Sequence, residues 1–361
     1  MKDSSSPILP KVSIVIPTKN RYPLLYEAVE SVCKQTYSNW EALIVDDGST
    51  DGTIEQMLAL SEEEPRIRFI RRSGNQPGAP ACRNEGVAVS TGDYIIFLDS
   101  DDCLAPFCLK NRVEAMETHP TLDFGVFPCQ LFRMKPGDVA LLWNVETQEN
   151  DLDRLLNLHD VPWQTASPIW RRQALTKLGR WDESLLRWQD WEFHFRALIK
   201  GLKYQRFAPP DCFWRVPGAG RESIGPMDTK PEHIRSNERL FSEVYSMLSQ
   251  MQLLDAYRQQ LLAGLYFWLA NKWASCGEKK EAVRVWTVCR EKKLIGNIEY
   301  WEGFFYFRVP DVHLAKRLAR KYLKIRWPKK LLAQRSITFQ NAPLPHDKEL
   351  HEKELYSSLN G

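Results

Sequence analysis

The sequence has no long hydrophobic run and no large excess of charge of either sign. Its 361 residues include 49 Lys+Arg and 46 Asp+Glu, so the net charge is +3 and nucleic acid is not an expected partner. The longest apolar stretch, 261–270, is far shorter than the roughly 20 residues that span a membrane. Residues 1–11 also lack the apolar region of a secretory signal. We therefore expect a cytoplasmic protein, either free or attached peripherally to a membrane face.

The sequence also lacks the cysteine patterns of metal sites and disulfide frameworks. Its eight cysteines include no C-x-x-C pair and no Cys/His cluster at the spacing of zinc ligands. We expect reduced, mostly buried thiols. A composition of 43% hydrophobic and 26% charged residues excludes a disordered or collagen-like chain, so a core can be buried.

Two domains are expected from the length, since domains usually run about 100–200 residues. The segment 217–231 is rich in Gly, Pro and polar residues, and we place the boundary there. Residues 1–220 would form an α/β domain, and 221–361 a smaller α-helical domain. Residues 261–275 and 278–289 resemble one hairpin of a helical repeat, but a solenoid needs about three or more copies.

Short apolar runs alternate with amphipathic segments over the first hundred residues. This pattern is typical of βαβ units around a mostly parallel sheet with flanking helices. The expected strands are 11–17, 40–45, 67–70 and 94–98, followed by one at 123–127, and the expected helices are 22–35, a helix from 53, and 79–89. Acidic clusters follow two of these strands, where the carboxyl ends of an open α/β sheet form its ligand crevice.

Four motifs occur in order along this region: VSIVIPTKNR at 12–21, IVDDGSTD at 44–51, ACRN at 81–84 and FLDSDD at 97–102. Together they resemble glycosyltransferase family 2, the inverting nucleotide-sugar transferases with the GT-A fold. The resemblance covers roughly residues 11–213.

The resemblance implies a nucleotide pocket at the ends of the first two strands. Asp47 matches the residue that contacts the base, usually uracil, and a carboxylate there can accept a base N–H. Thr18 and the backbone around Pro17 would line the same pocket. Lys19 stands where many relatives place a base-stacking aromatic, and a cation contact with the base or a phosphate is the alternative.

A sugar nucleotide carries a diphosphate, and clustered carboxylates suit the divalent cation, Mg²⁺ or Mn²⁺, that such a group needs. Asp99, Asp101 and Asp102 are the expected ligands, with an acidic turn or helix cap as the alternative. Arg83 would reach a phosphate or the donor sugar, or else pair with Asp99 or Asp101. Asn84 has similar alternatives, a contact with the donor or a contact within the protein.

Inversion needs a base that takes the proton of the acceptor hydroxyl. The segments WDES at 181–184 and RWQDWE at 187–192 resemble the family region in which the second acid of a pair is that base, and Asp190 matches it. Asp190 could instead cap the helix expected at 191–200. His194 is expected in the core or behind the site, not as a catalyst. The tract 163–170 is expected to face the acceptor, with its indoles either against a sugar or in the core.

The sequence thus predicts an inverting, metal-dependent glycosyltransferase that moves one sugar, with UDP-sugar as the favoured donor. The acceptor would be a glycan, a lipid-linked molecule or a protein. Two other classes remain: a catalytically silent nucleotide-sugar or glycan binder, and a nucleotidyltransferase, although no Gly-rich phosphate loop is present. Nine Lys/Arg between 311 and 335 face the single acid Asp311, which suits either peripheral contact with an anionic membrane or a solvated helix face.

Overall fold

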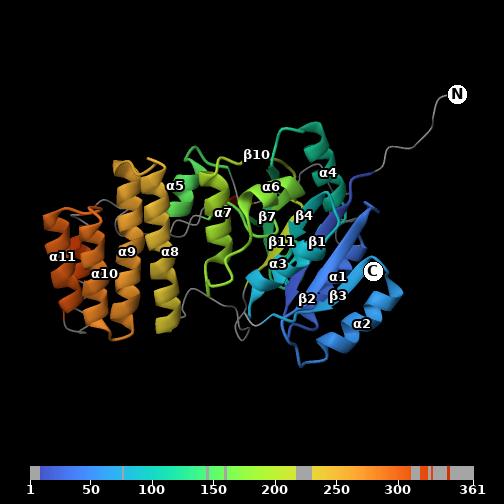
Figure 1. Ribbon diagram of the computed structural model, residues 1–361, viewed down its shortest axis with the longest axis horizontal. Helices are drawn as coiled ribbons and strands as arrows, with labels where there is room; N and C mark the ends of the chain where they lie inside the picture. Colours follow the sequence, from blue (N-terminus) through green and yellow to red (C-terminus); the bar gives the residue numbers. More distant parts are fainter. Residues whose placement is uncertain are drawn as a thin grey trace.

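The structure is a computed structural model, and it describes residues 9–74, 77–143, 146–157, 161–216, 230–309, 318–323, 327 and 340–341. The α/β part and the row of C-terminal helices lie side by side along the longest axis (Figure 1). All eight cysteines are unpaired, and six of them are buried. Within these ranges, every helix is too short or too polar to serve as a membrane span.

A seven-stranded sheet forms the centre of the α/β part, in the order β10-β6-β9-β4-β1-β2-β3. Its strands are β1 (Val12–Thr18), β2 (Trp40–Asp46), β3 (Ile67–Arg71), β4 (Tyr94–Phe97), β6 (Phe124–Val126), β9 (Pro168–Arg171) and β10 (Tyr204–Arg206). Only β9 runs antiparallel to its neighbours in the described part of this sheet. The expected mostly parallel sheet is confirmed.

Helices cover both faces of this sheet because its strands are apolar on both sides. Val12, Ile14 and Ile16 pack against α1 (Leu24–Cys33), α2 (Thr53–Glu63) and α4 (Cys108–Thr118). On the opposite face Val15 and Phe97 pack near α6 (Arg172–Leu178) and α7 (Gln189–Ile199). This alternation along β1 is the period-2 pattern of a strand buried on both faces.

Helix α3 (Ala79–Val89) lies close against β1 and β2. A Cβ atom at Gly86 would come 2.4 Å from a methyl carbon of Val15, so only glycine permits this close approach. Its position matters for function because α3 carries Arg83 toward the carboxyl ends of the strands.

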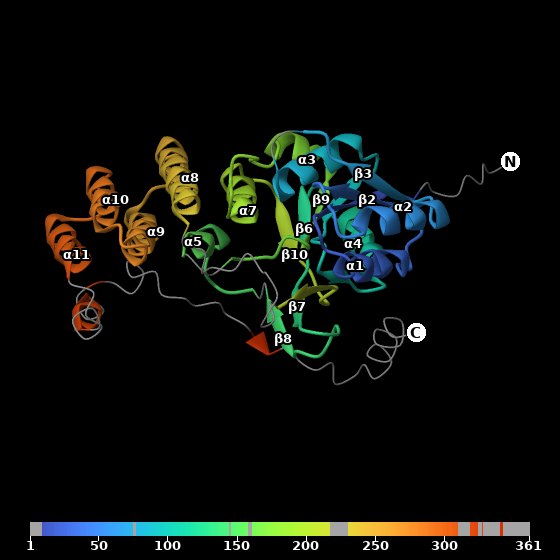
Figure 2. The same ribbon diagram turned by 90° about the horizontal axis from the view of Figure 1, so that it is seen from below.

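A second, smaller sheet was not expected from the sequence. Its order is β12-β8-β7-β11-β5. The strands are β5 (Cys103–Leu104), β7 (Cys129–Phe132), β8 (Leu141–Trp143), β11 (Cys212–Arg215) and β12 (Gln340–Asn341). Because β12 pairs with β8, residues 340–341 lie against the α/β part, where a red arrow beside β8 marks them (Figure 2).

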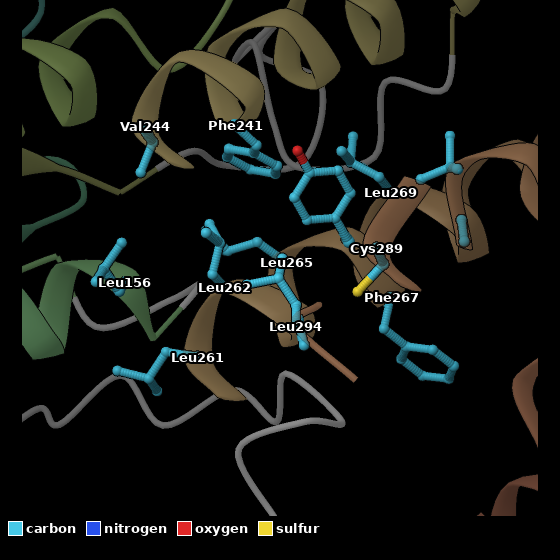
Figure 3. Packing of buried hydrophobic residues seen from close by; sticks show 14 of the residues in the cluster. Leu156, Phe241, Val244, Leu261, Leu262, Leu265, Phe267, Leu269, Cys289 and Leu294 are labelled. Carbon is cyan, nitrogen blue, oxygen red and sulfur yellow. The ribbon is translucent and has the colours of Figure 1, made fainter. Parts of the chain in front are cut away.

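The C-terminal helices are α8 (Pro231–Gln250), α9 (Ala256–Ser275), α10 (Lys279–Glu291) and α11 (Asn297–Arg308). Their core continues into the α/β part: Leu156 of α5 (Asp151–Leu156) belongs to one apolar cluster with Phe241 and Leu262 (Figure 3). The helices expected at 261–275 and 278–289 are confirmed as α9 and α10. The predicted boundary between residues 220 and 221 lies outside the described residues.

Candidate active site

The candidate site begins where β1, β2 and β4 end. These strands are parallel neighbours, so the loops after Thr18, Asp46 and Phe97 meet at one edge of the sheet. The register pairs Thr18 with Asp46, and the amide of Asp47 donates to the carbonyl of Thr18 over 2.9 Å. Pro17 lies within β1 opposite Val45 and is buried.

Asp46 and Asp47 have different roles in the loop after β2. The buried Asp46 carboxylate accepts the amides of Gly48 and Ser49 and so shapes the turn. The Asp47 side chain, 7% exposed, accepts from Arg72 Nε at 2.8 Å and from the amide of Gly78 at 2.9 Å. Sequence reasoning did not single out Arg72, although its place directly after β3 at the same sheet edge could have identified it.

Two other residues of the predicted nucleotide pocket lie beside Asp47. The Thr18 hydroxyl is buried and has no hydrogen-bond partner among the described residues. Buried hydroxyls are usually bonded, so this oxygen suits a site that a ligand completes. The Lys19 ammonium lies 3.6 Å from the Asp47 carboxylate and is 54% exposed, which leaves it accessible to a base or a phosphate.

The three acids after β4 separate into two environments. Asp99 and Asp101 are about one-third exposed, at 32% and 33%, and pair with Arg83 at 2.5 Å and Arg21 at 3.2 Å. Burial and the charge of Asp99 raise the pKa of Asp101, while Arg21 lowers it. The two neighbouring carboxylates therefore repel each other, and a cation between them would relieve that repulsion.

Asp102 points into the protein interior. Its side chain accepts from Gln164 Nε2 at 2.8 Å and from the amide of Arg215 at 2.9 Å. Burial, then the charges of Asp101 and Asp99, raise its pKa well above the ordinary value. Asp102, predicted as a metal ligand, is only 1% exposed in this structure, and its carboxylate bonds to internal donors and not toward the strand-end pocket. Gln164 and Arg215 give no local sequence signal for this role.

Within the described ranges, no three His, Cys, Asp or Glu side chains surround a common point as a complete metal site. A pair of partly exposed carboxylates nevertheless fits the chemistry of Mg²⁺, which proteins often hold through one or two carboxylates plus substrate phosphates. Asp99 and Asp101 satisfy that description. The phosphates of a donor would complete the ligand set.

Arg83 and Asn84 connect α3 to the segment that precedes α7. The Arg83 guanidinium stacks 4.5 Å over the Trp181 ring while pairing with Asp99. The Asn84 side chain donates to the Trp181 carbonyl, accepts the Trp181 amide, each over 2.9 Å, and also donates to Glu183. Of the two alternatives for Arg83, the ion pair is present in this structure. Asn84 holds backbone and does not face the pocket.

Asp190 lies in the first turn of α7, with Trp188 at the N-cap position. Its carboxylate accepts the amide of Trp191 over 2.9 Å. Burial raises the pKa of Asp190; the charge of Arg83 lowers it and that of Asp99 raises it. The helix that carries Asp190 also meets Arg83 through Trp181, whose ring lies under the Arg83 guanidinium and stacks on Phe193 of α7 at 4.0 Å. A carboxylate of raised pKa is a stronger base than one of ordinary pKa.

The aromatic residues around this site belong to the core. Trp163 and Trp170 are fully buried, so of the two alternatives for the indoles of tract 163–170 the structure has core packing. His194 is 1% exposed, and burial together with the charge of Arg83 lowers its pKa to about 3. The ring is therefore neutral at physiological pH, in agreement with the predicted core position.

Comparisons with known proteins agree with this arrangement. A family model described as glycosyl transferase family 2 matches residues 13–165, and one described as glycosyl transferase family group 2 matches residues 94–260. An uncharacterized glycosyltransferase of Haemophilus influenzae is 36% identical over 197 residues, 54% of this chain and 74% of that protein. The putative colanic acid biosynthesis glycosyl transferase WcaA of Escherichia coli is 40% identical over 124 residues, 34% of this chain and 44% of that protein.

Other relatives are longer than the region they share with this chain. The chain spans 64% of another Haemophilus influenzae glycosyltransferase and 17% of one from Rickettsia felis. Among solved structures, S. aureus TarS 1–349 in complex with UDP-GlcNAc superposes with a TM-score of 0.58 at 17% identity, over 82% of this chain and 91% of that one. At this level of identity the superposition concerns the fold, a GT-A arrangement with helices after it.

Proposed function

Because the chain belongs to glycosyltransferase family 2, we propose that it transfers one sugar from a nucleotide-sugar donor to a hydroxyl acceptor, with inversion at the anomeric carbon. The observation that carries this proposal is the Arg83–Asp99 ion pair at the carboxyl edge of the sheet, where Arg83 also lies over the Trp181 ring that stacks on Phe193 of α7, the helix that carries Asp190. Inverting transfer requires a base for the acceptor hydroxyl and positive charge beside the departing diphosphate. Asp190 would be the base, and Arg83 would supply positive charge.

We propose a UDP-sugar as the donor, because of the Asp-Asp-Gly-Ser loop. Asp47 would accept a hydrogen bond from the base, and the unpartnered Thr18 hydroxyl would bond to the nucleoside. The name of the WcaA relative refers to colanic acid, a surface polysaccharide. From this name we propose only the class of acceptor for this chain. It would be a glycan, or a lipid-linked or protein-linked precursor of a glycan.

Asp99 and Asp101 would hold the divalent cation. When bound, Mg²⁺ or Mn²⁺ would neutralise negative charge on the departing nucleoside diphosphate. Arg83 and Arg21, now paired with these two acids, would then be available to the phosphates. Asp102 would act indirectly, by tying the loop that carries both acids to β11.

Asp190 is the proposed general base. Its carboxylate would take the proton of the acceptor hydroxyl as that oxygen attacks the anomeric carbon. The bond from this carbon to the diphosphate oxygen breaks, and its electron pair leaves with the diphosphate. The positive charge of Arg83 would favour the ionised form of Asp190 that this step needs.

We also propose peripheral contact with an anionic membrane through the basic stretch 311–335, of which only 318–323 and 327 are described. In that part Arg320 and Lys321 are exposed, as is Tyr322. Trp301 and Phe305 of neighbouring α11 are 48% and 63% exposed. Cationic side chains beside exposed aromatic rings suit the interface of an anionic bilayer.

The test of the proposed activity is Asp190→Asn, which keeps the size of the side chain and removes its basicity. We expect transfer to fall by about 10²–10⁴-fold, the usual contribution of a positioned acid or base, while UDP affinity stays within about twofold of wild type. Glu55→Gln is the matched control, because Glu55 is an exposed acid in the first turn of α2.

Sugar transfer and UDP calorimetry on the purified variants distinguish the outcomes. If Asp190 only stabilised the start of a helix, both substitutions would leave transfer nearly unchanged, since loss of its charge from the first turn would cost only about 1 kcal/mol of stability or less. Near wild-type transfer by Asp190→Asn would therefore contradict the proposed mechanism. A wild-type protein that binds UDP but turns over no donor would favour the silent binder.

A further inference from the structure

We infer that helix α8 positions Asp190, so that the C-terminal helices are part of the catalytic apparatus. The inference rests on the proposed function. Segment 182–188 immediately precedes Asp190, and α8 contacts it along most of its length. We call this set of contacts the brace. Figures 1 and 2 both show α8 directly beside α7, which carries Asp190.

The polar part of the brace comes from one face of α8. The amide of Leu186 donates to Ser236 Oγ over 3.2 Å, and Arg187 Nε donates to His233 Nδ1 over 3.3 Å. Arg239 donates to Ser184 Oγ over 2.5 Å and lies 3.4 Å from a carboxylate oxygen of Asp182. The three α8 residues are spaced three apart, which places them along the same side of the helix.

The apolar part of the brace centres on Trp188. Its ring lies 5.3 Å from the Phe241 ring of α8 and 5.4 Å from the Trp268 ring of α9. Its φ angle is +62°, a left-handed conformation that non-glycine residues adopt only where the surroundings hold them. Packing against two C-terminal helices thus fixes the turn from which α7 starts.

The position of Asp190 depends on this turn because only Gln189 separates it from Trp188. The α7 start is also held from α5, since Trp191 Nε1 donates to the carbonyl of Leu155 over 2.8 Å. Catalytic groups must be placed to within a fraction of an ångström. Loosening the brace should therefore lower the rate of transfer more than it lowers donor binding, which uses the strand ends.

Arg239→Gln tests the polar contacts, with Arg284→Gln as the matched control. The Arg239 and Arg284 side chains are 44% and 45% exposed, and each pairs with two acids. Only Arg239 contacts the braced segment. We expect Arg239→Gln to speed hydrogen exchange in residues 184–192 and to lower kcat about fivefold or more, with UDP affinity within about twofold. Arg284→Gln should change neither.

Trp188→Gly and Trp188→Phe test the apolar contacts. Glycine accepts the left-handed φ without strain, so this variant keeps the turn and loses only the indole. We expect kcat to fall about tenfold or more in Trp188→Gly, and Trp188→Phe to recover most of it, at unchanged UDP affinity. Equal kcat in the glycine variant and wild type, or a loss of UDP binding that parallels the loss of rate, would overturn the inference.

The two hypotheses fail in different ways. Absence of turnover by the wild-type protein, with the donor that raises its melting temperature most, would overturn the proposed function and the catalytic meaning of the brace with it. Normal wild-type turnover together with unchanged hydrogen exchange and kcat in Arg239→Gln and Trp188→Gly would overturn the brace alone. Faster exchange at unchanged kcat would likewise show that the brace does not serve catalysis.

Discussion

At the scale of single residues, carboxylates of this protein whose pKa is shifted fall into two kinds. Burial raises the pKa of Asp102 and Asp190, and their few donors do not compensate. Glu41 of β2 is also buried, but it accepts from Ser13 Oγ at 2.7 Å and from the Thr91 amide at 2.6 Å. Asp102 and Asp190 cost stability when ionised, and of these two only Asp190 is proposed for a chemical role, whereas Glu41 stabilises the fold.

Glu41 therefore predicts a pH dependence of stability. Burial raises its pKa, but the bonds from Thr91, Ser13 and Lys11 outweigh burial and lower it from 4.5 to about 2. A depressed folded-state pKa gives stability that is present above 4.5 and is lost as pH falls toward 2. The shift corresponds to about 3 kcal/mol.

Urea unfolding of wild type and Glu41→Gln at pH 7 and pH 3 measures this contribution. We expect the variant to be less stable than wild type at pH 7. The difference in unfolding free energy should shrink at pH 3, because Glu41 of the unfolded chain binds a proton there. A difference that is the same at both values would mean that the ionised form of Glu41 is not preferentially stabilised.

At the scale of elements, the carboxyl ends of β1, β2 and β4 combine the proposed nucleotide pocket with two repelling acids. This placement predicts that UDP binding requires a divalent cation. We expect UDP affinity in Mn²⁺ to exceed that in EDTA by about tenfold or more, a difference of about 1.4 kcal/mol per tenfold. Asp101→Asn should abolish most of this dependence, because it removes one of the two proposed ligands.

Isothermal calorimetry on both proteins provides the measurement. Glu114→Gln is the control, since Glu114 is an exposed acid of α4 with no place in the site. Equal UDP affinity with and without EDTA would refute the metal proposal. Full metal dependence in Asp101→Asn would assign the cation to other ligands.

At the scale of the whole molecule, the C-terminal helices share a core with α5 and α7, and segment 318–323 after them carries the exposed basic residues Arg320 and Lys321. The membrane proposal predicts that reversing both charges weakens binding to vesicles containing anionic lipid by tenfold or more, since each cation near such a surface contributes about 1 kcal/mol. Co-sedimentation with anionic and neutral vesicles measures it. The control Lys110→Glu/Lys280→Glu reverses two other exposed charges. If all the proteins bound the vesicles equally, or if binding did not depend on lipid charge, the basic stretch 311–335 would be only a solvated helix face.

The sequence by itself determined the order and type of the elements in the first hundred residues, because apolar periodicity is a local property. It also placed Asp47, Asp99 and Asp101 at one sheet edge, since parallel strands end on the same side. The helix that carries Asp190 was expected two residues too late, as helix starts depend on nearby contacts such as those of Trp188.

Only the tertiary structure decided which of the neighbouring acids are partly exposed at the strand ends. Asp102 is one residue from Asp101, yet it points inward because its partner, the amide of Arg215, is 113 residues away. The burial of Trp163 and Trp170, the second sheet and the brace on Asp190 also depend on distant contacts. Apolar periodicity indicates which residues are buried. It does not indicate which distant group each side chain contacts in the folded protein.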